Sequence, residues 1–215
     1  MEELKHHEMN RLYRQASLLA LVTIFYNMLE GMVSIWFGLS DETIALFGFG
    51  ADSFVEVISG IAVWHMVRRA MRADPDSSRD AFERTSLRVT GGAFYLLTIG
   101  LICGAIINLL QGHVPQTTFW GIVISIISIF TMWLLIRAKK KVGHALSSAA
   151  ILADAACTRT CLQLSGVLLV SSIGYELSGF GYFDSIGSLV IAWFAWKEGK
   201  EAFSKAAGES CCCCS

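Results

Sequence analysis

Long apolar stretches, separated by short polar ones, dominate this chain. Six of them are long and apolar enough to be helices that cross roughly 30 Å of hydrocarbon at 1.5 Å per residue. They lie near residues 16–39, 43–67, 88–111, 117–137, 147–173 and 183–197. The pattern predicts an all-α, polytopic membrane protein with six transmembrane helices in one bundle.

Basic residues occur at every second connection between these stretches. All Lys and Arg residues except Arg159 lie before the first stretch, around the second and fourth connections, or after the sixth stretch. Because basic flanks stay in the cytoplasm, both termini are expected there. The predicted organisation is a cytoplasmic segment over 1–15, a transmembrane domain over 16–197 and a cytoplasmic cysteine-rich tail over 198–215.

Composition agrees with a location in lipid. Only 16% of the 215 residues are charged, whereas soluble domains carry about 25%. The formal net charge of -1 gives no reason to expect a nucleic-acid partner. No cleavable signal peptide is visible, because the first fifteen residues are polar. We expect a multi-pass protein of the cell (inner) membrane, in contact with membrane lipid.

Ionisable residues inside the apolar stretches are candidates for function, because their burial in lipid is costly. Asp52 and Glu56 stand four residues apart in the second stretch, so one face of a helix carries both carboxylates. Two adjacent carboxylates in a medium of low dielectric repel each other and should share at least one proton. A bound cation would displace that proton.

Cys157 and Cys161 form a matching pair in the fifth stretch. Counted from the helix ends, Asp52 and Cys157 each lie roughly 14–15 Å deep, so the four side chains meet if the two helices are neighbours. Two carboxylates and two thiolates suit Zn²⁺ or a softer ion such as Cd²⁺. Taken alone, the cysteines are more often packing residues, since a free cysteine behaves as a small hydrophobe.

Several other polar residues are candidates for roles outside the ligand set. Asn27, Glu30 and Asp154 are candidates for a cytosolic vestibule or a proton path. Asp184, at the outer end of the last stretch, either caps a helix or takes part in ion exit. The tail could capture soft metal ions or carry palmitoyl groups through Cys211, Cys212, Cys213 and Cys214. Gly100 and Gly104 allow close helix packing, within the bundle or in a homodimer.

An enzyme is not expected. Intramembrane aspartyl proteases need Gly-x-Gly-Asp with no intervening residue, but Ala51 separates Gly50 from Asp52 in the run GFGAD. No organic cofactor is expected either. The residues favour a metal carrier, and the alternatives are a membrane protein that binds metal for sensing or storage, or a passive metal channel.

Several motifs together resemble the cation diffusion facilitator family. They are GFGADSFVEV at 48–57, ADAACTRTC at 153–161 and YFDSIGS at 182–188. In that family the second helix carries an acidic residue or His, then Ser, two variable residues and Asp; here the second acid is Glu56. The fifth helix of the family often reads Ala-Asp-Ala-x-His-x-Arg-Ser-Asp, and here cysteines replace the His and the last Asp.

The resemblance implies that Asp52, Glu56, Cys157 and Cys161 form the transport site. It also implies efflux of a divalent metal ion from the cytosol, coupled to inward proton movement by alternating access. Family members usually carry a cytoplasmic ferredoxin-like domain after the sixth helix, which is expected to be missing here. The cysteines shift the expected selectivity toward soft ions, with Zn²⁺ and Cd²⁺ as the predicted substrates.

Overall fold

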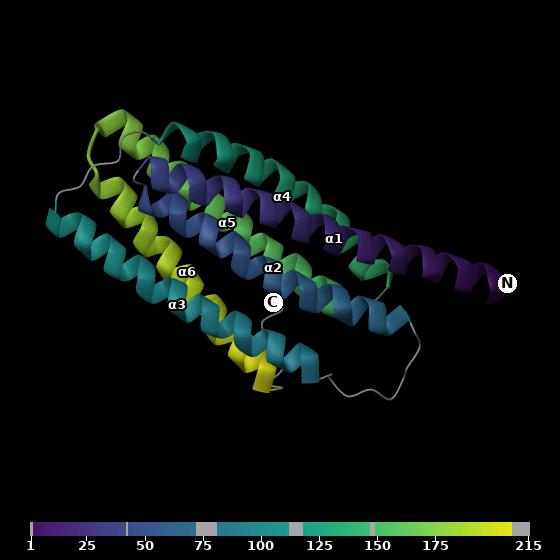
Figure 1. The fold of residues 1–215 in the computed structure, drawn as a ribbon. Coiled ribbons are helices and arrows are strands. Elements are labelled where there is room, and N and C mark those ends of the chain that lie inside the picture. Colours follow the sequence, from purple (N-terminus) through teal and green to yellow (C-terminus); the bar gives the residue numbers. More distant parts are fainter. Residues whose placement is uncertain (1, 42, 72–80, 112–117, 147–148, 208–215) are drawn as a thin grey trace.

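The computed structural model describes residues 2–41, 43–71, 81–111, 118–146 and 149–207. These residues form six α-helices and no strand (Figure 1). The helices are α1 (Glu2–Ser40), α2 (Ile44–Met71), α3 (Ala81–Gln111), α4 (Phe119–Ala145), α5 (Ala149–Ser178) and α6 (Tyr182–Ala207). Each predicted apolar stretch lies almost entirely within one helix. The prediction of an all-helical, polytopic membrane protein is confirmed.

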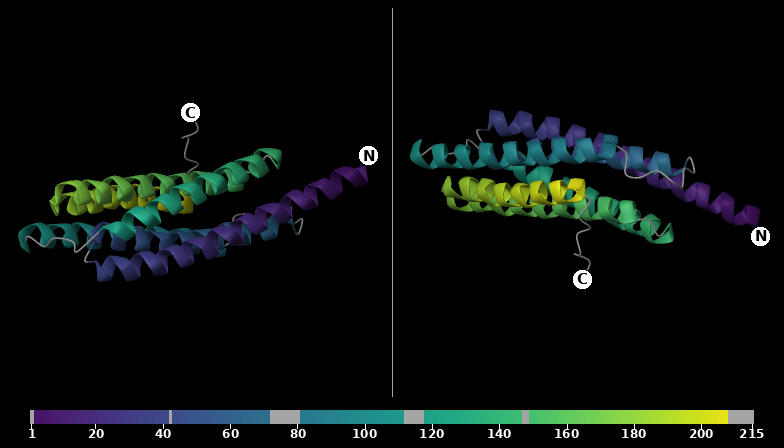
Figure 2. Two further views of the ribbon diagram at one scale, coloured as in Figure 1. Left: turned by 90° about the horizontal axis from the view of Figure 1, so that it is seen from above. Right: turned by 90° about the horizontal axis from the view of Figure 1, so that it is seen from below.

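The helices run roughly along one long axis and reverse direction at each connection. The principal neighbours are α1 with α2, α3 with α6, and α4 with α5. Viewed edge-on, α1, α2 and α3 lie on one side of the bundle and α5 and α6 on the other (Figure 2). α2 also contacts α5 and α6, so the acid-bearing helix occupies the centre of the molecule.

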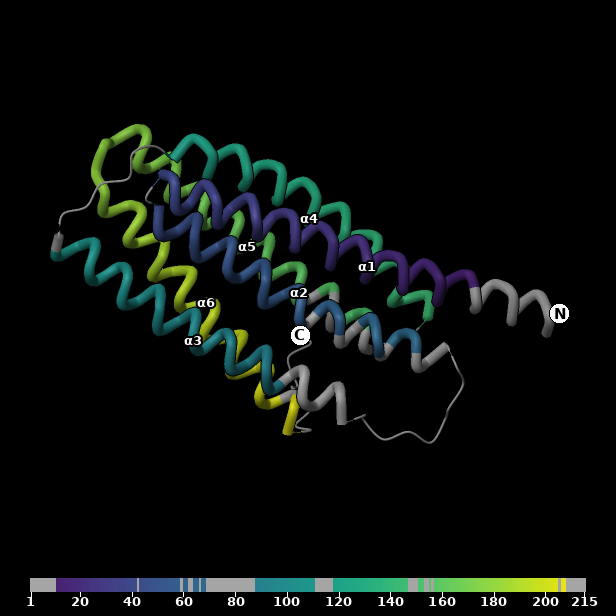
Figure 3. The backbone as a smooth tube through the Cα atoms, viewed as in Figure 1, coloured from purple at the N-terminus to yellow at the C-terminus, as the bar shows by residue number. Residues whose placement is uncertain are grey.

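Glycines bring α1 and α2 into close contact, as the backbone trace in Figure 3 shows. A Cβ on Gly38 would lie 2.6 Å from the backbone nitrogen of Phe47, and one on Gly50 would lie 2.8 Å from that of Ile35. Only glycine permits this approach at both positions. The contact holds the polar face of α1 against the part of α2 that carries the acid pair.

The outer surface of the bundle is apolar in the manner of a protein that contacts lipid. Exposed apolar side chains include Phe25, Leu96, Phe130 and Val170, each more than 60% exposed. Within the described residues, four helices contain segments long and apolar enough to cross a membrane, at Arg11–Ser40, Arg88–Leu110, Phe119–Ala145 and Cys157–Ser178. α2 and α6 have 28 and 26 residues, about 40 Å of helix, and lie alongside them.

Helix ends extend beyond the predicted apolar stretches. α4 continues through the basic residues after Arg137 to Ala145, and α6 continues ten residues past Lys197. Lysine and alanine favour helix, so leaving the hydrocarbon does not end it. α5 ends where Gly179 adopts a positive φ of 69° and its N–H donates to the carbonyl of Tyr175.

The face of α3 around Gly100 is open. No heavy atom lies within 4 Å of a Cβ placed at Gly100, whereas Gly104 packs near Ile44 of α2. The surface at Gly100 is therefore available to lipid or to a second copy of the chain, and a homodimer stays a prediction.

Candidate metal site

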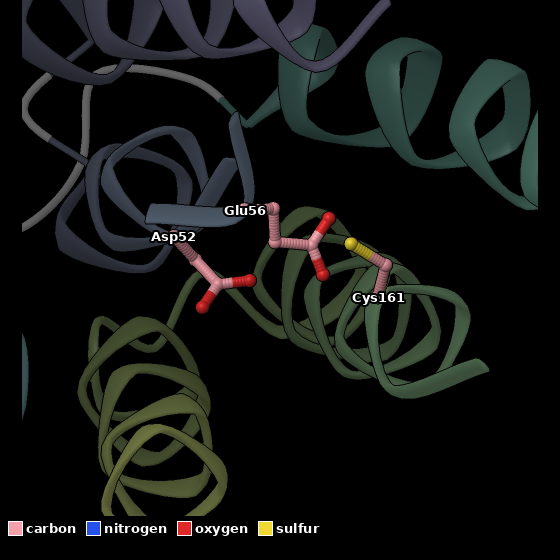
Figure 4. Close-up of side chains that lie close together, drawn as sticks. All are labelled: Asp52, Glu56 and Cys161. Carbon is pink, nitrogen blue, oxygen red and sulfur yellow. The ribbon is translucent and has the colours of Figure 1, made fainter. Parts of the chain in front are cut away.

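The site is built on one face of α2 and one face of α5. Asp52 and Glu56 stand one turn apart on α2, and Cys161 faces them from α5. One ligand atom of each residue lies within 4.8 Å of the other two. Figure 4 shows the carboxylate of Glu56 between the carboxylate of Asp52 and the sulfur of Cys161. Asp52 is 2% exposed and Cys161 is 1% exposed, whereas Glu56 is half-buried, so Glu56 is the most accessible member of the cluster.

Hydrogen bonds orient the central carboxylate of this cluster. The Nδ2 of Asn27, on α1, donates to Oε2 of Glu56 at 2.8 Å, and the Cys161 thiol is also hydrogen-bonded to Glu56. Asn27 is completely buried, and its Oδ1 has no hydrogen-bond partner in the described part of the chain. A buried carbonyl oxygen without a partner is costly and is also a potential metal ligand.

A third carboxylate lies next to the cluster without joining it. Glu30 of α1 accepts hydrogen bonds from the hydroxyls of Tyr26, at 2.9 Å, and Ser53, at 3.2 Å. It is also hydrogen-bonded to Ser128 of α4. Ser53 directly follows Asp52, so Glu30 is connected to the cluster of ligand side chains through one residue of α2.

The donor set fits a small divalent ion. Around a tetrahedral Zn²⁺ with bonds of 2.0–2.3 Å, neighbouring ligand atoms are about 3.3–3.8 Å apart. The three ligand atoms lie within 4.8 Å of one another. Side-chain rotations that move these atoms by about 1 Å would bring them to the spacing around Zn²⁺. Two carboxylates can neutralise both charges of the ion, and the sulfur favours Zn²⁺ or Cd²⁺ over Mg²⁺.

The remaining predicted site residues lie elsewhere. Cys157 is half-buried one turn before Cys161 and is not in the group whose ligand atoms lie within 4.8 Å. Asp154 belongs to α5, but its side chain is outside the described residues, as is the predicted capture segment Cys211, Cys212, Cys213 and Cys214.

Two ionisable residues near the site lie just beyond the apolar stretches, so the search for charges inside those stretches does not reveal them. Lys139 of α4 is 1% exposed and donates from Nζ to the hydroxyl of Thr158 at 2.8 Å. Glu198 of α6 accepts a hydrogen bond from the hydroxyl of Thr160 at 3.0 Å. The buried residues of α4 recur every three or four positions and include Leu135, Lys139 and Val142. Extending that period past the apolar stretch would have found Lys139.

Comparisons with known proteins agree with this architecture. The profile of the cation efflux transmembrane domain matches residues 18–209, which include the cluster and most of the helical bundle. An uncharacterized transporter of Methanocaldococcus jannaschii is 28% identical over 178 residues, which are 80% of this chain and 62% of that protein. The chain thus spans less than two thirds of that relative's length. A family match of this extent confirms the predicted resemblance, and the chain belongs to the cation efflux family of membrane transporters.

Proposed function

We propose that this protein exports Zn²⁺ or Cd²⁺ from the cytosol in exchange for protons, by alternating access. The observation that carries the proposal is the cluster of Asp52, Glu56 and Cys161 at mid-depth in the domain of a cation efflux family, with Asp52 and Cys161 buried and Glu56 half-buried. Glu56 lies twelve residues along α2, about 18 Å from its outer end. A cation bound there is far from both membrane surfaces, as alternating access requires.

The two carboxylates and the thiolate have different roles: the carboxylates supply charge, and the thiolate sets the selectivity for the metal ion. Asp52 and Glu56 supply negative charge, and Cys161 supplies a soft thiolate that favours Zn²⁺ and Cd²⁺ over Mn²⁺. Cys157 and the Oδ1 of Asn27 are the two candidates for a fourth ligand. Cys157 lies one turn from Cys161 on the same helix, and Asn27 already contacts Glu56.

Proton coupling follows from the chemistry of these ligands. Thiolate and carboxylate ligands bind metal only after they lose their protons, so binding releases protons and protonation favours release of the metal. Glu30, with Asp154, is the proposed path for these protons. Glu30 supports this role because it is buried, is joined to Asp52 through Ser53 and is not itself part of the ligand cluster.

The end of the bundle that takes up metal from the cytosol depends on the orientation of the bundle. Three helices place a cation over a tryptophan four residues earlier: Arg68 over Trp64, Arg137 over Trp133 and Lys197 over Trp193. The pairs on α2 and α4 lie in the carboxyl-terminal halves of these helices, and the third pair lies at the middle of α6 with Lys197 on the carboxyl-terminal side. The carboxyl ends of the three helices share one end of the bundle. Tryptophan and basic residues together are typical of the cytoplasmic interface, so this end is proposed to face the cytosol.

Metal flux into proteoliposomes under an imposed pH gradient tests the proposal. We expect Zn²⁺ or Cd²⁺ flux that follows the proton gradient, that is abolished in Asp52→Ala and that falls sharply in Cys161→Ser. Cys103→Ser is the matched control, because Cys103 is exposed on α3 and should leave flux unchanged.

Two other outcomes would favour the alternatives. Flux that is indifferent to the pH gradient would identify a passive channel. Metal binding without flux in any condition would identify a sensor or a storage protein, and the export proposal would then be rejected.

A further inference from the structure

The end of α4 that is proposed to face the cytosol carries a stripe of basic side chains. Arg137, Lys140, Lys141 and His144, the basic stripe, are all exposed and follow the spacing i, i+3, i+4, i+7. At 3.6 residues per turn, this spacing places them within a stripe about 100° wide on one face of the helix. Because α4 continues as a helix to Ala145, the basic stripe is carried on a rigid element.

The opposite face of the same segment packs into the bundle. Leu135 belongs to an apolar cluster with Cys161 of α5, and Val142 belongs to another with residues of α1, α2 and α5. α4 is a peripheral helix whose principal neighbours are α5 and α1 (Figure 1). Packing therefore fixes the rotation of α4 and directs the basic stripe away from the protein.

The charges of the basic stripe have no acidic partner in the part of the chain that the structure describes. α4 contains no Asp or Glu between Phe119 and Ala145, and no ion pair joins the stripe to a carboxylate of another described helix. α6 differs, because its lysines alternate with Glu198 and Glu201. Like charges three or four residues apart on a helix repel each other, so an external anion would stabilise the stripe.

Trp133 indicates the depth of the basic stripe in the membrane. It stands one turn before Arg137, whose guanidinium lies 3.7 Å from the centre of its ring, and tryptophan concentrates at the boundary between hydrocarbon and headgroups. From Arg137 to Lys141 the helix rises about 6 Å. The headgroup layer on each side of a bilayer is about 5–8 Å thick, so the cations of the stripe lie at the level of the lipid phosphates.

We propose that the basic stripe binds the phosphate groups of anionic phospholipids in the cytoplasmic leaflet. Clusters of basic residues immediately beyond a membrane helix are typical of such binding, because their charge complements that of the lipids. The choice of leaflet rests on the orientation proposed above, whereas the binding itself depends neither on that orientation nor on metal export. Since α4 packs against the helix that carries Cys161, bound lipid also holds one wall of the metal cluster in place.

The test is lipid binding to the full-length protein in detergent, measured by native mass spectrometry. Dioleoyl phosphatidylglycerol, which is anionic, is compared with dioleoyl phosphatidylcholine, which has the same chains and no net charge. We expect the wild type to prefer phosphatidylglycerol. Each of Arg137→Gln, Lys140→Gln and Lys141→Gln should lower the affinity for phosphatidylglycerol by about fivefold and leave the affinity for phosphatidylcholine unchanged.

Two kinds of variant serve as controls. Lys197→Gln and Lys200→Gln each remove an exposed charge of α6, where glutamates lie nearby in the helix, and should keep the preference for phosphatidylglycerol. Lys140→Arg keeps the charge of the stripe and should also keep the preference. The unfolding temperature without added lipid should be the same for all of these variants, so a change in lipid affinity reports on the surface charge and not on the fold.

The result that would overturn the proposal is an unchanged preference in all three glutamine variants of α4, or an equal loss in the two variants of α6. Inorganic phosphate separates a lipid site from a site for soluble anions. If phosphate at the concentration of the lipid displaces phosphatidylglycerol, the stripe binds soluble anions and the lipid proposal is rejected. Export is tested independently, because no metal ion is added in this experiment.

Discussion

Cys161 and Cys157 occupy the same face of α5 but differ in their surroundings. Cys161 is buried in the cluster with Asp52 and Glu56, and Cys157 is half-buried one turn away. We expect Cys161→Ser to lower Cd²⁺ affinity by at least about tenfold, since even the loss of a residue that orients a ligand costs 10–100-fold. Cys157→Ser should have a smaller effect. The Cd²⁺–thiolate absorption of the two variants measures this, and equal losses would contradict the ranking.

Asn27 offers a second test at the scale of one residue. Its amide holds Glu56, and its Oδ1 is buried without a partner in the described part of the chain. Asn27→Leu should therefore lower metal affinity by about tenfold. Asn108→Leu is the matched control, because Asn108 is also buried but contacts Ser185 on α6. Calorimetric titration of the two variants with Zn²⁺ compares them, and equal affinities would remove Asn27 from the site.

Some of the site residues can be predicted from the sequence and others cannot. Asp52 and Glu56 are recognisable because a carboxylate pair inside an apolar stretch is costly to keep there without a bound cation or proton. Lys139 is not recognisable from the sequence, because it follows the apolar stretch among other basic residues that flank the membrane. Whether such a residue faces water or the bundle depends on the rotation of α4 about its axis, which the apolar pattern defines only when it is followed into the basic segment.

At the scale of the elements, Asp184 joins α6 to the start of α2. Its carboxylate accepts hydrogen bonds from the backbone N–H groups of Ile44, at 3.0 Å, and Ala45, at 3.1 Å. These donors belong to the first turn of α2, where helical N–H groups have no partner within the helix. Asp184 thus caps a neighbouring helix, which is one of the two roles expected from the sequence.

We expect Asp184→Ala to destabilise the protein by about 1–3 kcal/mol, because it leaves the buried N–H of Ala45 and the part-buried N–H of Ile44 without acceptors. Glu176→Ala is a useful comparison, since the exposed Glu176 accepts a hydrogen bond from the N–H of Thr118 before α4. Its loss should cost less, because water can replace the carboxylate. Thermal unfolding in detergent measures both, and a larger loss for Glu176→Ala would contradict this account.

The positions of the helices were predictable, but their contacts were less so. Hydropathy locates a transmembrane stretch because lipid imposes its length. The pairing of α3 with α6, and the capping of α2 by a residue 140 positions later, depend on how side chains of distant segments fit together. A single sequence gives no measure of that fit.

At the scale of the whole molecule, metal binding should be coupled to pH. The ligands of the cluster must lose protons to bind a metal ion, so protons and metal compete. Affinity for Zn²⁺ should therefore fall as the pH is lowered from about 8 to 6. Calorimetry in buffers with different ionisation enthalpies counts the protons released per ion. Binding that releases no proton would contradict the exchange mechanism.

The proposed orientation of the bundle predicts which end can be labelled from outside the cell. If the end with the Trp64, Trp133 and Trp193 pairs faces the cytosol, the opposite end, where α1 finishes, faces outward. Ser40 and Lys140 are exposed at these two ends, so single cysteines at the two positions should respond differently to a membrane-impermeant maleimide. The background for both variants has the seven native cysteines replaced by serine.

In intact cells we expect Ser40→Cys to be labelled and Lys140→Cys to be protected until the membrane is permeabilised. The opposite pattern would place the tryptophan–cation pairs outside. Under the same inward proton gradient, the protein would then take up metal at the end of the bundle where α1 finishes. That is the end proposed here to release the metal. The labelling pattern therefore decides the topology and which end of the bundle takes up the metal, because the cluster itself lies at mid-depth and favours neither side. The proton gradient, and not the topology, sets the direction of transport.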